Sequence, residues 1–149
     1  MISFRQWRVD GDQLNSLCVE YAWQPDENHA VCIYGHLHQD QEVPDSHCGC
    51  GFYSYRADDA NFGEWGTKGV IVSGAIQTWG KTQIHAKGIR SQTAKVIALC
   101  GNPKISAQKL QELRVRYQVP VFSNHCEMTA YVRTQGSEAP PLRWNVAAC

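Results

Sequence analysis

The stretch VCIYGHLHQDQEVPDSHCGCGFYSY, residues 31–55, holds three cysteines and three histidines within twenty-five positions. It is also rich in glycine and aspartate, so the sequence predicts a loop here rather than a regular helix or strand. Such a loop needs something other than its own backbone hydrogen bonds to hold it in one conformation. Cysteine and histidine are residues that zinc prefers as ligands in proteins. The sequence therefore predicts a zinc-stapled metal loop over residues 30–52.

Cys32, Cys48 and Cys50 are the predicted thiolate ligands of this loop. Thiolates are soft and charged, so they displace water from Zn²⁺ and suit a tetrahedral site. Cys48 and Cys50 form a C-x-C pair interleaved with glycines. Glycine permits the tight backbone path that turns both thiolates toward one ion. The C-x-C spacing is less specific for zinc than paired C-x₂-C knuckles.

A histidine is expected to complete the site as its fourth ligand. His38 is the predicted ligand and His36 is the alternate, because both follow Cys32 closely enough to close a chelate loop. His47 is a poorer candidate because it directly precedes the C-x-C pair. His38 stands shortly before Pro44, a turn-forming residue that is expected to direct the chain back toward the cysteines.

Two alternatives to a structural zinc site stay open. The three cysteines can be buried free thiols, which behave as small apolar side chains, although the polarity of the loop argues against this. A site with three protein ligands and one water would be catalytic and would need a carboxylate base nearby. Asp40, Glu42 and Asp45 are the acidic residues of the loop. Such residues are more often simply solvated, so a closed structural site is the favoured interpretation.

Composition narrows the class of protein. The length of 149 residues predicts a single domain, 1–149. Fourteen basic residues balance fourteen acidic ones, and this neutrality does not favour a nucleic-acid partner. No apolar run approaches the ~20 residues that cross a bilayer, and the N-terminus lacks the apolar core of a secretory signal. We therefore expect a cytoplasmic protein without a membrane partner. Its seven cysteines, an odd number, favour metal ligation over a disulfide framework.

The order of the predicted elements indicates an α+β fold, with a β-rich part over residues 1–100. Alternating apolar and polar residues on either side of Gly11 predict a β-hairpin. Residues 52–62 predict one or two helical turns. Three further β-rich runs, separated by WGK and AKG, predict an antiparallel meander over 70–78, 82–86 and 89–99.

Residues 101–136 predict a helix, a short strand and a second helix, and a tail follows over 137–149. Ser106 is the expected N-cap of the first helix, whose apolar face includes Leu113 and Tyr117. The predicted architecture is thus an antiparallel β-sheet with a zinc-stapled loop and two C-terminal helices.

Trp79, His85 and Arg90 are a candidate interaction surface on the predicted sheet. His85 and Arg90 flank the AKG turn, where a polar contact site is one interpretation and a hairpin with solvated side chains is the other. The second interpretation is favoured. Trp79 more often belongs to a core or an interface than to a base-stacking platform.

Three motifs carry a resemblance to a known family. They are W-x-P-x-x-N-x-A-x-C (23–32), P-x-x-x-C-x-C-G-F-Y (44–53) and G-x-I-x-x-W-G-x-x-x-x-H-x-x-G-x-R (74–90). Together they resemble a family of small proteins found in actinobacteria and their phages, over roughly residues 5–100. The resemblance implies that Cys32, Cys48, Cys50 and a loop histidine belong together. It carries no catalytic role over to this chain.

The favoured function is a small zinc-stabilised binding protein that acts on a protein partner. A phage accessory protein or inhibitor would fit a small, neutral chain of this kind. One alternative is a zinc-dependent hydrolase that acts on nucleotides or nucleic acid, with water on the metal. The third is a nucleic-acid-binding module, which zero net charge makes the least favoured. Its basic residues would be Arg5, Arg8, Lys81, Lys87 and Arg90.

Overall fold

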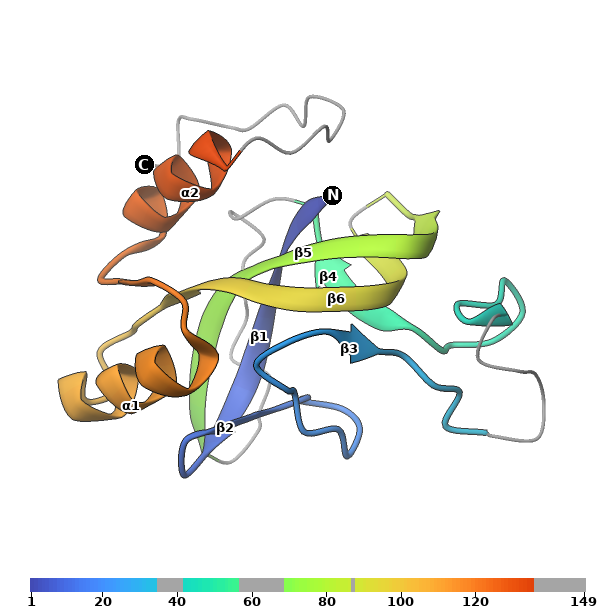
Figure 1. Cartoon of the computed structure of the whole chain (residues 1–149). Helices are drawn as coiled ribbons and strands as arrows, with labels where there is room; N and C mark the ends of the chain where they lie inside the picture. Colours follow the sequence, from blue (N-terminus) through green and yellow to red (C-terminus); the bar gives the residue numbers. More distant parts are fainter. Residues whose placement is uncertain (35–41, 57–68, 87, 136–149) are drawn as a thin grey trace.

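The computed structural model describes residues 1–34, 42–56, 69–86 and 88–135. These residues form a mostly antiparallel β-sheet and two helices, so the predicted α+β class is confirmed (Figure 1). The elements in chain order are β1 (Ile2–Asp10), β2 (Gln13–Asn15), β3 (Asn28–His29), β4 (Phe52–Tyr55), β5 (Val70–Ile84), β6 (Gly88–Cys100), α1 (Ala107–Tyr117), β7 (Val121–Phe122) and α2 (His125–Thr134). No helix among the described residues is long and apolar enough to cross a bilayer.

The N-terminal hairpin forms where the sequence predicts it. β1 and β2 pair antiparallel, with Val9 opposite Leu14. Gly11 lies in the turn with a φ of 57°, a left-handed conformation that glycine adopts without strain. The second strand is only three residues long, shorter than the predicted alternation.

The predicted meander of three strands is wrong, because two long strands take its place. β5 runs unbroken through the WGK sequence and pairs with β6 along most of its length. The register shifts between Trp79 and Thr82, and Gly80 lies there with a φ of 75°. Glycine at positive φ suits a β-bulge as well as a turn. Gly80 therefore lies at a bulge within one continuous strand and does not end it.

The sheet closes on itself through β4, at the segment predicted to be helical. β4 pairs with β6 along its length and touches β1 through Phe4 opposite Tyr55, while β5 pairs with both β1 and β6. Four strands thus form a closed ring, β1–β5–β6–β4. Phe52 and Ser54 are buried and Tyr53 is exposed, a period of two that is typical of a strand. The helical prediction is wrong at 52–55, and 57–62 lies outside the described residues.

Each helix packs against a different apolar core. Trp7, Leu14, Trp23, Leu113 and Tyr117 belong to the larger apolar core, which α1 covers. A smaller core, formed by residues of β1, β5 and β6, packs against α2 through Met128 and Val132. Figure 1 shows both helices at one end of the sheet and the loop that precedes β4 at the other. The loop is therefore distant from the helices.

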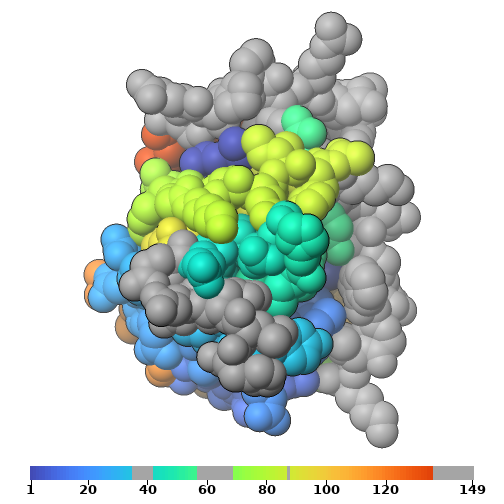
Figure 2. All heavy atoms as spheres, turned by 90° about the vertical axis from the view of Figure 1, so that its right-hand side faces the viewer, coloured from blue at the N-terminus to red at the C-terminus, as the bar shows by residue number. Residues whose placement is uncertain are grey.

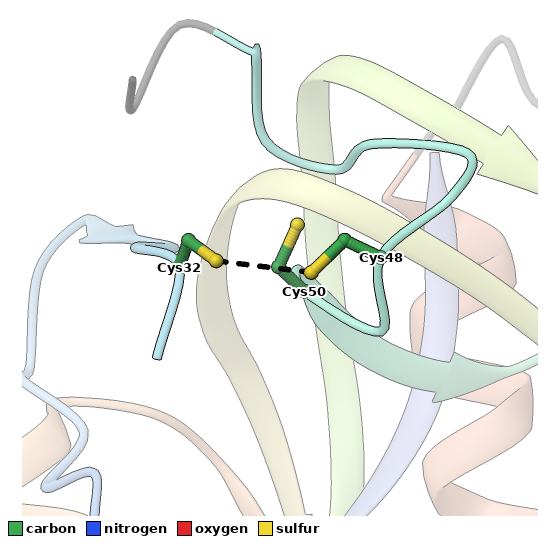
Figure 3. A group of neighbouring side chains, drawn as sticks. All are labelled: Cys32, Cys48 and Cys50. Carbon is green, nitrogen blue, oxygen red and sulfur yellow. Dashed lines mark hydrogen bonds between the residues drawn. The ribbon is translucent and has the colours of Figure 1, made fainter. Parts of the chain in front are cut away.

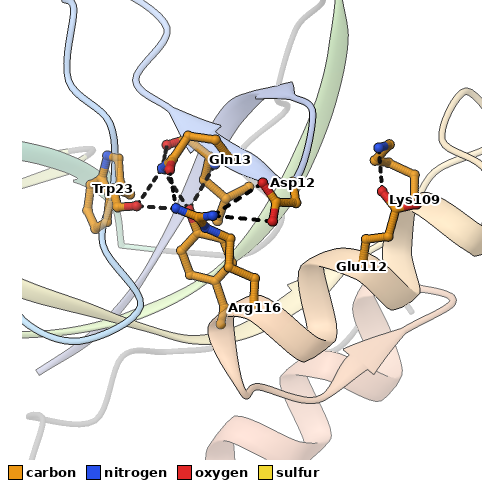
Figure 4. A network of polar contacts seen from close by, with 8 residues as sticks. Asp12, Gln13, Trp23, Lys109, Glu112 and Arg116 are labelled. Carbon is orange, nitrogen blue, oxygen red and sulfur yellow. Dashed lines mark hydrogen bonds and ion pairs between the residues drawn. The ribbon is translucent and has the colours of Figure 1, made fainter.

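Helix α1 is tied to the hairpin by a buried polar network (Figure 4). The Tyr117 hydroxyl accepts from the backbone N–H of Leu14 at 2.9 Å and donates to the carbonyl of Trp23 at 2.8 Å. Arg116 pairs with the Asp12 carboxylate at 3.2 Å. The predicted N-cap is confirmed as well, because Ser106 accepts from the backbone N–H three residues later. The second helix ends at Thr134, two residues before the end predicted at 136, and the tail over 137–149 lies outside the described residues.

Candidate metal centre

Three cysteines from two separate segments converge at the end of the sheet away from the helices. The sulfur atoms of Cys32, Cys48 and Cys50 all lie within 4.8 Å of one another. Cys32 follows β3, whereas Cys48 and Cys50 lie directly before β4. Figure 3 shows the Cys32 and Cys48 side chains turned toward each other, with their sulfur atoms 3.7 Å apart. The structure brings together all three predicted thiolate ligands, which form a group that can hold a metal ion.

The sulfur spacing suits a tetrahedral metal–thiolate site. With a Zn–S bond of about 2.3 Å, two sulfurs of a regular tetrahedron lie about 3.8 Å apart. The separation of Cys32 from Cys48 is close to that edge. Three thiolates at such distances repel one another unless a cation lies between them. The donor set therefore fits a soft divalent ion.

A tight turn delivers the C-x-C pair to the cluster. The backbone N–H of Cys48 donates to the carbonyl of Asp45 at 3.4 Å, and that of Asp45 donates to the sulfur of Cys50 at 3.3 Å. Gly51 then leads into β4 with a φ of 107°. A Cβ at Gly51 would lie 2.9 Å from the Cβ of Pro44, so the position requires glycine. Gly49, the other glycine of the motif, is not constrained in this way.

Three side chains of the β5–β6 hairpin hold the metal loop in place through hydrogen bonds to its backbone. Lys81 donates its Nζ to the carbonyl of residue 42 at 2.7 Å, and Gln83 donates to the carbonyl of Pro44 at 3.3 Å. Arg90 donates to the carbonyls of both Cys48 and Cys50. The local sequence carries no signal for these contacts, because they join residues about forty positions apart.

The thiols of Cys32 and Cys48 perturb each other. Desolvation raises the pKa of Cys32, and the neighbouring Cys48 sulfur raises it further. Desolvation also acts on Cys48, but hydrogen bonds from the Cys50 backbone and the Cys32 thiol outweigh it and lower the pKa of Cys48. Cys48 is thus the first of this pair to become a thiolate.

Two of the cysteines lie against the main apolar core. Cys32 is 6% exposed and Cys50 is 4% exposed, and both belong to the core that contains Trp23 and Val43. Cys48 is half-buried. The polarity of the loop is therefore a poor argument against buried thiols, because Ser46 and His47 are exposed while Cys32 and Cys50 lie against the core. The convergence of three sulfur atoms is what favours metal ligation.

His38 and His36 both lie outside the described residues, as does Asp40. The His47 side chain is 94% exposed, and its Nδ1 lies 3.0 Å from the hydroxyl of Ser46. Among the described residues, no further histidine, cysteine or carboxylate joins the three-cysteine group.

The three residues of the candidate interaction surface differ in their exposure to solvent. Trp79 is half-buried opposite Thr93, at the bulge of β5. His85 is exposed, and its Nε2 lies 3.3 Å from the Nε of Arg90, which donates to it. Arg90 is only 6% exposed. It supports the metal loop and offers almost no surface to a partner.

Exposed apolar side chains lie close to the cysteines in the chain and at the end of the β5–β6 hairpin instead. Figure 2 faces the side of the molecule that carries the metal loop and the end of the β5–β6 hairpin. Five large apolar side chains next to the ligands or at the hairpin end are each more than half exposed. They are Val31, Ile33, Tyr34, Tyr53 and Ile84. Sequence reasoning missed them, because apolar residues that flank metal ligands are ordinarily expected to point inward.

Comparisons of the chain with protein-family models, with curated proteins and with solved structures find no match. The resemblance to the actinobacterial and actinophage family therefore stays a prediction that rests on its three motifs. The chemistry that the site offers is therefore metal binding by the three cysteines.

Proposed function

We propose that this chain is a small zinc-stabilised binding protein. Cys32, Cys48, Cys50 and a loop histidine, His38 or alternatively His36, would hold one Zn²⁺. The observation that supports this most directly is the convergence of three sulfur atoms within 4.8 Å. Tetrahedral sites of three cysteines and one histidine are an established structural zinc type.

A structural role for the metal follows from its position in the fold. The C-x-C pair directly precedes β4, the short strand that closes the ring between β1 and β6. The described parts of the segment between β3 and β4, residues 30–34 and 42–51, contain no β-strand or α-helix of their own. A metal that joins the two ends of this loop holds β4 in register. Structural zinc sites contribute free energy on the order of 10 kcal/mol in favourable cases.

The binding role is supported by the apolar side chains around the metal loop. Ile33 and Ile84 are 63% and 55% exposed. Apolar residues gathered on one face of a protein are typical of protein–protein contact sites. The partner in this proposal is a protein. A cytoplasmic location and an accessory or inhibitory role in a phage belong to the same proposal and rest on the sequence alone.

Elemental analysis of purified protein tests the metal centre. We expect about one zinc per chain, lost together with most of the cooperative thermal transition in Cys48→Ser or Cys50→Ser. Cys18→Ser is the matched control, because Cys18 is an exposed free cysteine outside the group. Fully folded wild-type protein that contains no metal would refute the proposal.

Capture from a host lysate with surface variants tests the binding role. Ile33→Ser, in the metal loop beside Cys32, is expected to lose a partner that the wild-type chain retains. Val115→Ser is the control, since Val115 is 67% exposed on α1 at the other end of the molecule. A captured protein whose binding is equally weakened by both variants, or by neither, would contradict a docking site around the metal.

The Co²⁺-substituted protein separates this proposal from a hydrolase. A catalytic ion keeps a position open for water, whereas a closed site has none. Added azide is expected to leave the visible spectrum of the cobalt form unchanged. A spectral change on titration with azide would instead indicate an open metal position and favour the hydrolase.

A further inference from the structure

Arg90 is a buried cation directed at the backbone of two metal-binding residues. It is 6% exposed and extends from β6 beneath the turn that carries the C-x-C pair. Its Nη1 donates to the carbonyls of Cys48 and Cys50. Its Nη2 donates to the side-chain oxygen of Gln83, and its Nε donates to His85 at 3.3 Å. Four acceptors thus hold the guanidinium in one orientation.

All four of these acceptors are neutral. Two are backbone carbonyls, one is an amide and one is an imidazole. Within the described part of the chain, Arg90 forms no ion pair with a carboxylate. Burying a charge without a countercharge is costly. The position of Arg90 therefore calls for negative charge close to the Cys48–Cys50 turn.

The proposed metal centre would supply that charge. A divalent ion held by the three thiolates carries one net negative charge. We propose that Arg90 is the counter-cation and positioning residue of the metal centre, an inference that rests on the proposed function. Its single positive charge balances the excess of the thiolates, and its contacts fix the backbone that presents two of them.

Arginine suits this role better than lysine. Its planar guanidinium offers donors in a fixed fork, so one side chain reaches both carbonyls, Gln83 and His85 together. The Arg90 guanidinium carbon also lies 5.7 Å from the centre of the Tyr53 ring, which adds a cation–π contact. A lysine ammonium would retain the charge without this network.

Chelator competition on folded protein tests the proposal. Loss of residues that orient metal ligands typically weakens metal affinity by about 10- to 100-fold. We expect a loss of zinc affinity in this range for Arg90→Met and Arg90→Gln, and a smaller loss for Arg90→Lys. Arg116→Gln is the control, because it removes an arginine that pairs with Asp12 on the far side of the fold. Unchanged zinc affinity in both neutral variants would overturn the proposal.

A spectroscopic readout separates electrostatic from purely structural effects. Removing a nearby positive charge raises the energy of the thiolate electrons. In the Co²⁺ form, the sulfur-to-metal charge-transfer band should therefore move to lower energy in Arg90→Gln but much less in Arg90→Lys. Equal shifts in the two variants would overturn the counter-cation role. If both neutral variants fail to fold while Arg90→Lys folds with zinc, charge is the requirement and the proposal stands. If Arg90→Lys also fails to fold, the role is geometric and the proposal is wrong.

The zinc content of the wild-type protein distinguishes this inference from the proposed function. Zinc-free, folded wild-type protein would refute both. A wild type that holds zinc, together with Arg90 variants that bind it equally well, would refute only the role of Arg90.

Discussion

The two glycines of the metal loop are expected to respond very differently to the same substitution. Gly51 has a φ of 107°, and a Cβ there would lie 2.9 Å from the Cβ of Pro44 and 3.4 Å from the carbonyl oxygen of Ser91. Gly49 has no such φ, and a Cβ there would meet only the Tyr53 hydroxyl, at an ordinary 3.6 Å. Gly51→Ala and Gly49→Ala are therefore a matched pair, two positions apart.

The expected cost of Gly51→Ala has two parts. Placing a side chain in a left-handed conformation costs about 1–2 kcal/mol, and overpacking against buried neighbours typically costs about 1–3 kcal/mol. Together they predict a loss of about 2–5 kcal/mol in the free energy of unfolding. For a chain of this size that lowers the melting temperature by roughly 4–20 °C. Gly49→Ala should change the stability by less than about 1 kcal/mol, and reduced freedom of the unfolded chain can make that change favourable.

Thermal unfolding of the zinc-loaded variants, followed by circular dichroism, measures both effects. Zinc retention against a chelator should fall in Gly51→Ala, because Gly51 joins the C-x-C pair to β4, and should stay near wild type in Gly49→Ala. Equal destabilisation by the two substitutions, or a larger effect at Gly49, would show that the path of the C-x-C turn is not as described.

Three other predictions concern single side chains. His38→Ala should weaken zinc retention severely and His36→Ala little, as measured by chelator competition; the reverse ranking would assign the ligand to His36. Tyr117→Phe removes the acceptor of a buried backbone N–H and should cost about 2 kcal/mol at neutral pH by urea denaturation. Burial raises the pKa of Tyr117, so the wild type should lose stability as the pH rises from about 10 through that raised pKa, and the variant should lack this slope. Burial raises the pKa of Cys100 to about 11, so at pH 8 mass spectrometry should find Cys18 alkylated and Cys100 unmodified.

The elements that local sequence determines were predictable. Helix α1 begins at a serine cap and buries Leu113 and Tyr117 one turn apart, and both signals lie within a dozen residues. The hairpin around Gly11 is equally local. The break predicted near Gly80 was wrong because a glycine at positive φ serves a turn or a bulge, and pairing with β6 decides between them.

Of the candidate site, only the group of cysteines was predictable. Residue type and spacing predicted that Cys32, Cys48 and Cys50 come together, and their sulfur atoms do converge. The support of the loop was not predictable. Arg90 was expected to be solvated, since charged residues usually are, and its burial depends on the carbonyls of a turn forty-two positions earlier in the chain.

The ring of strands sets an order for folding. The β5–β6 hairpin is closed locally by a hydrogen bond from His85 to Gly88, so it can form early. The β1–β5 pairing, in which Ile2 lies opposite Gln77, must wait for a long chain segment to close, and such non-local contacts slow folding. In the proposed site, a metal that joins Cys32 to Cys48 would shorten that segment before the ring closes. The rate of refolding in stopped-flow fluorescence should therefore rise when zinc is supplied at the start, and zinc added after ring closure should act only on the rate of unfolding.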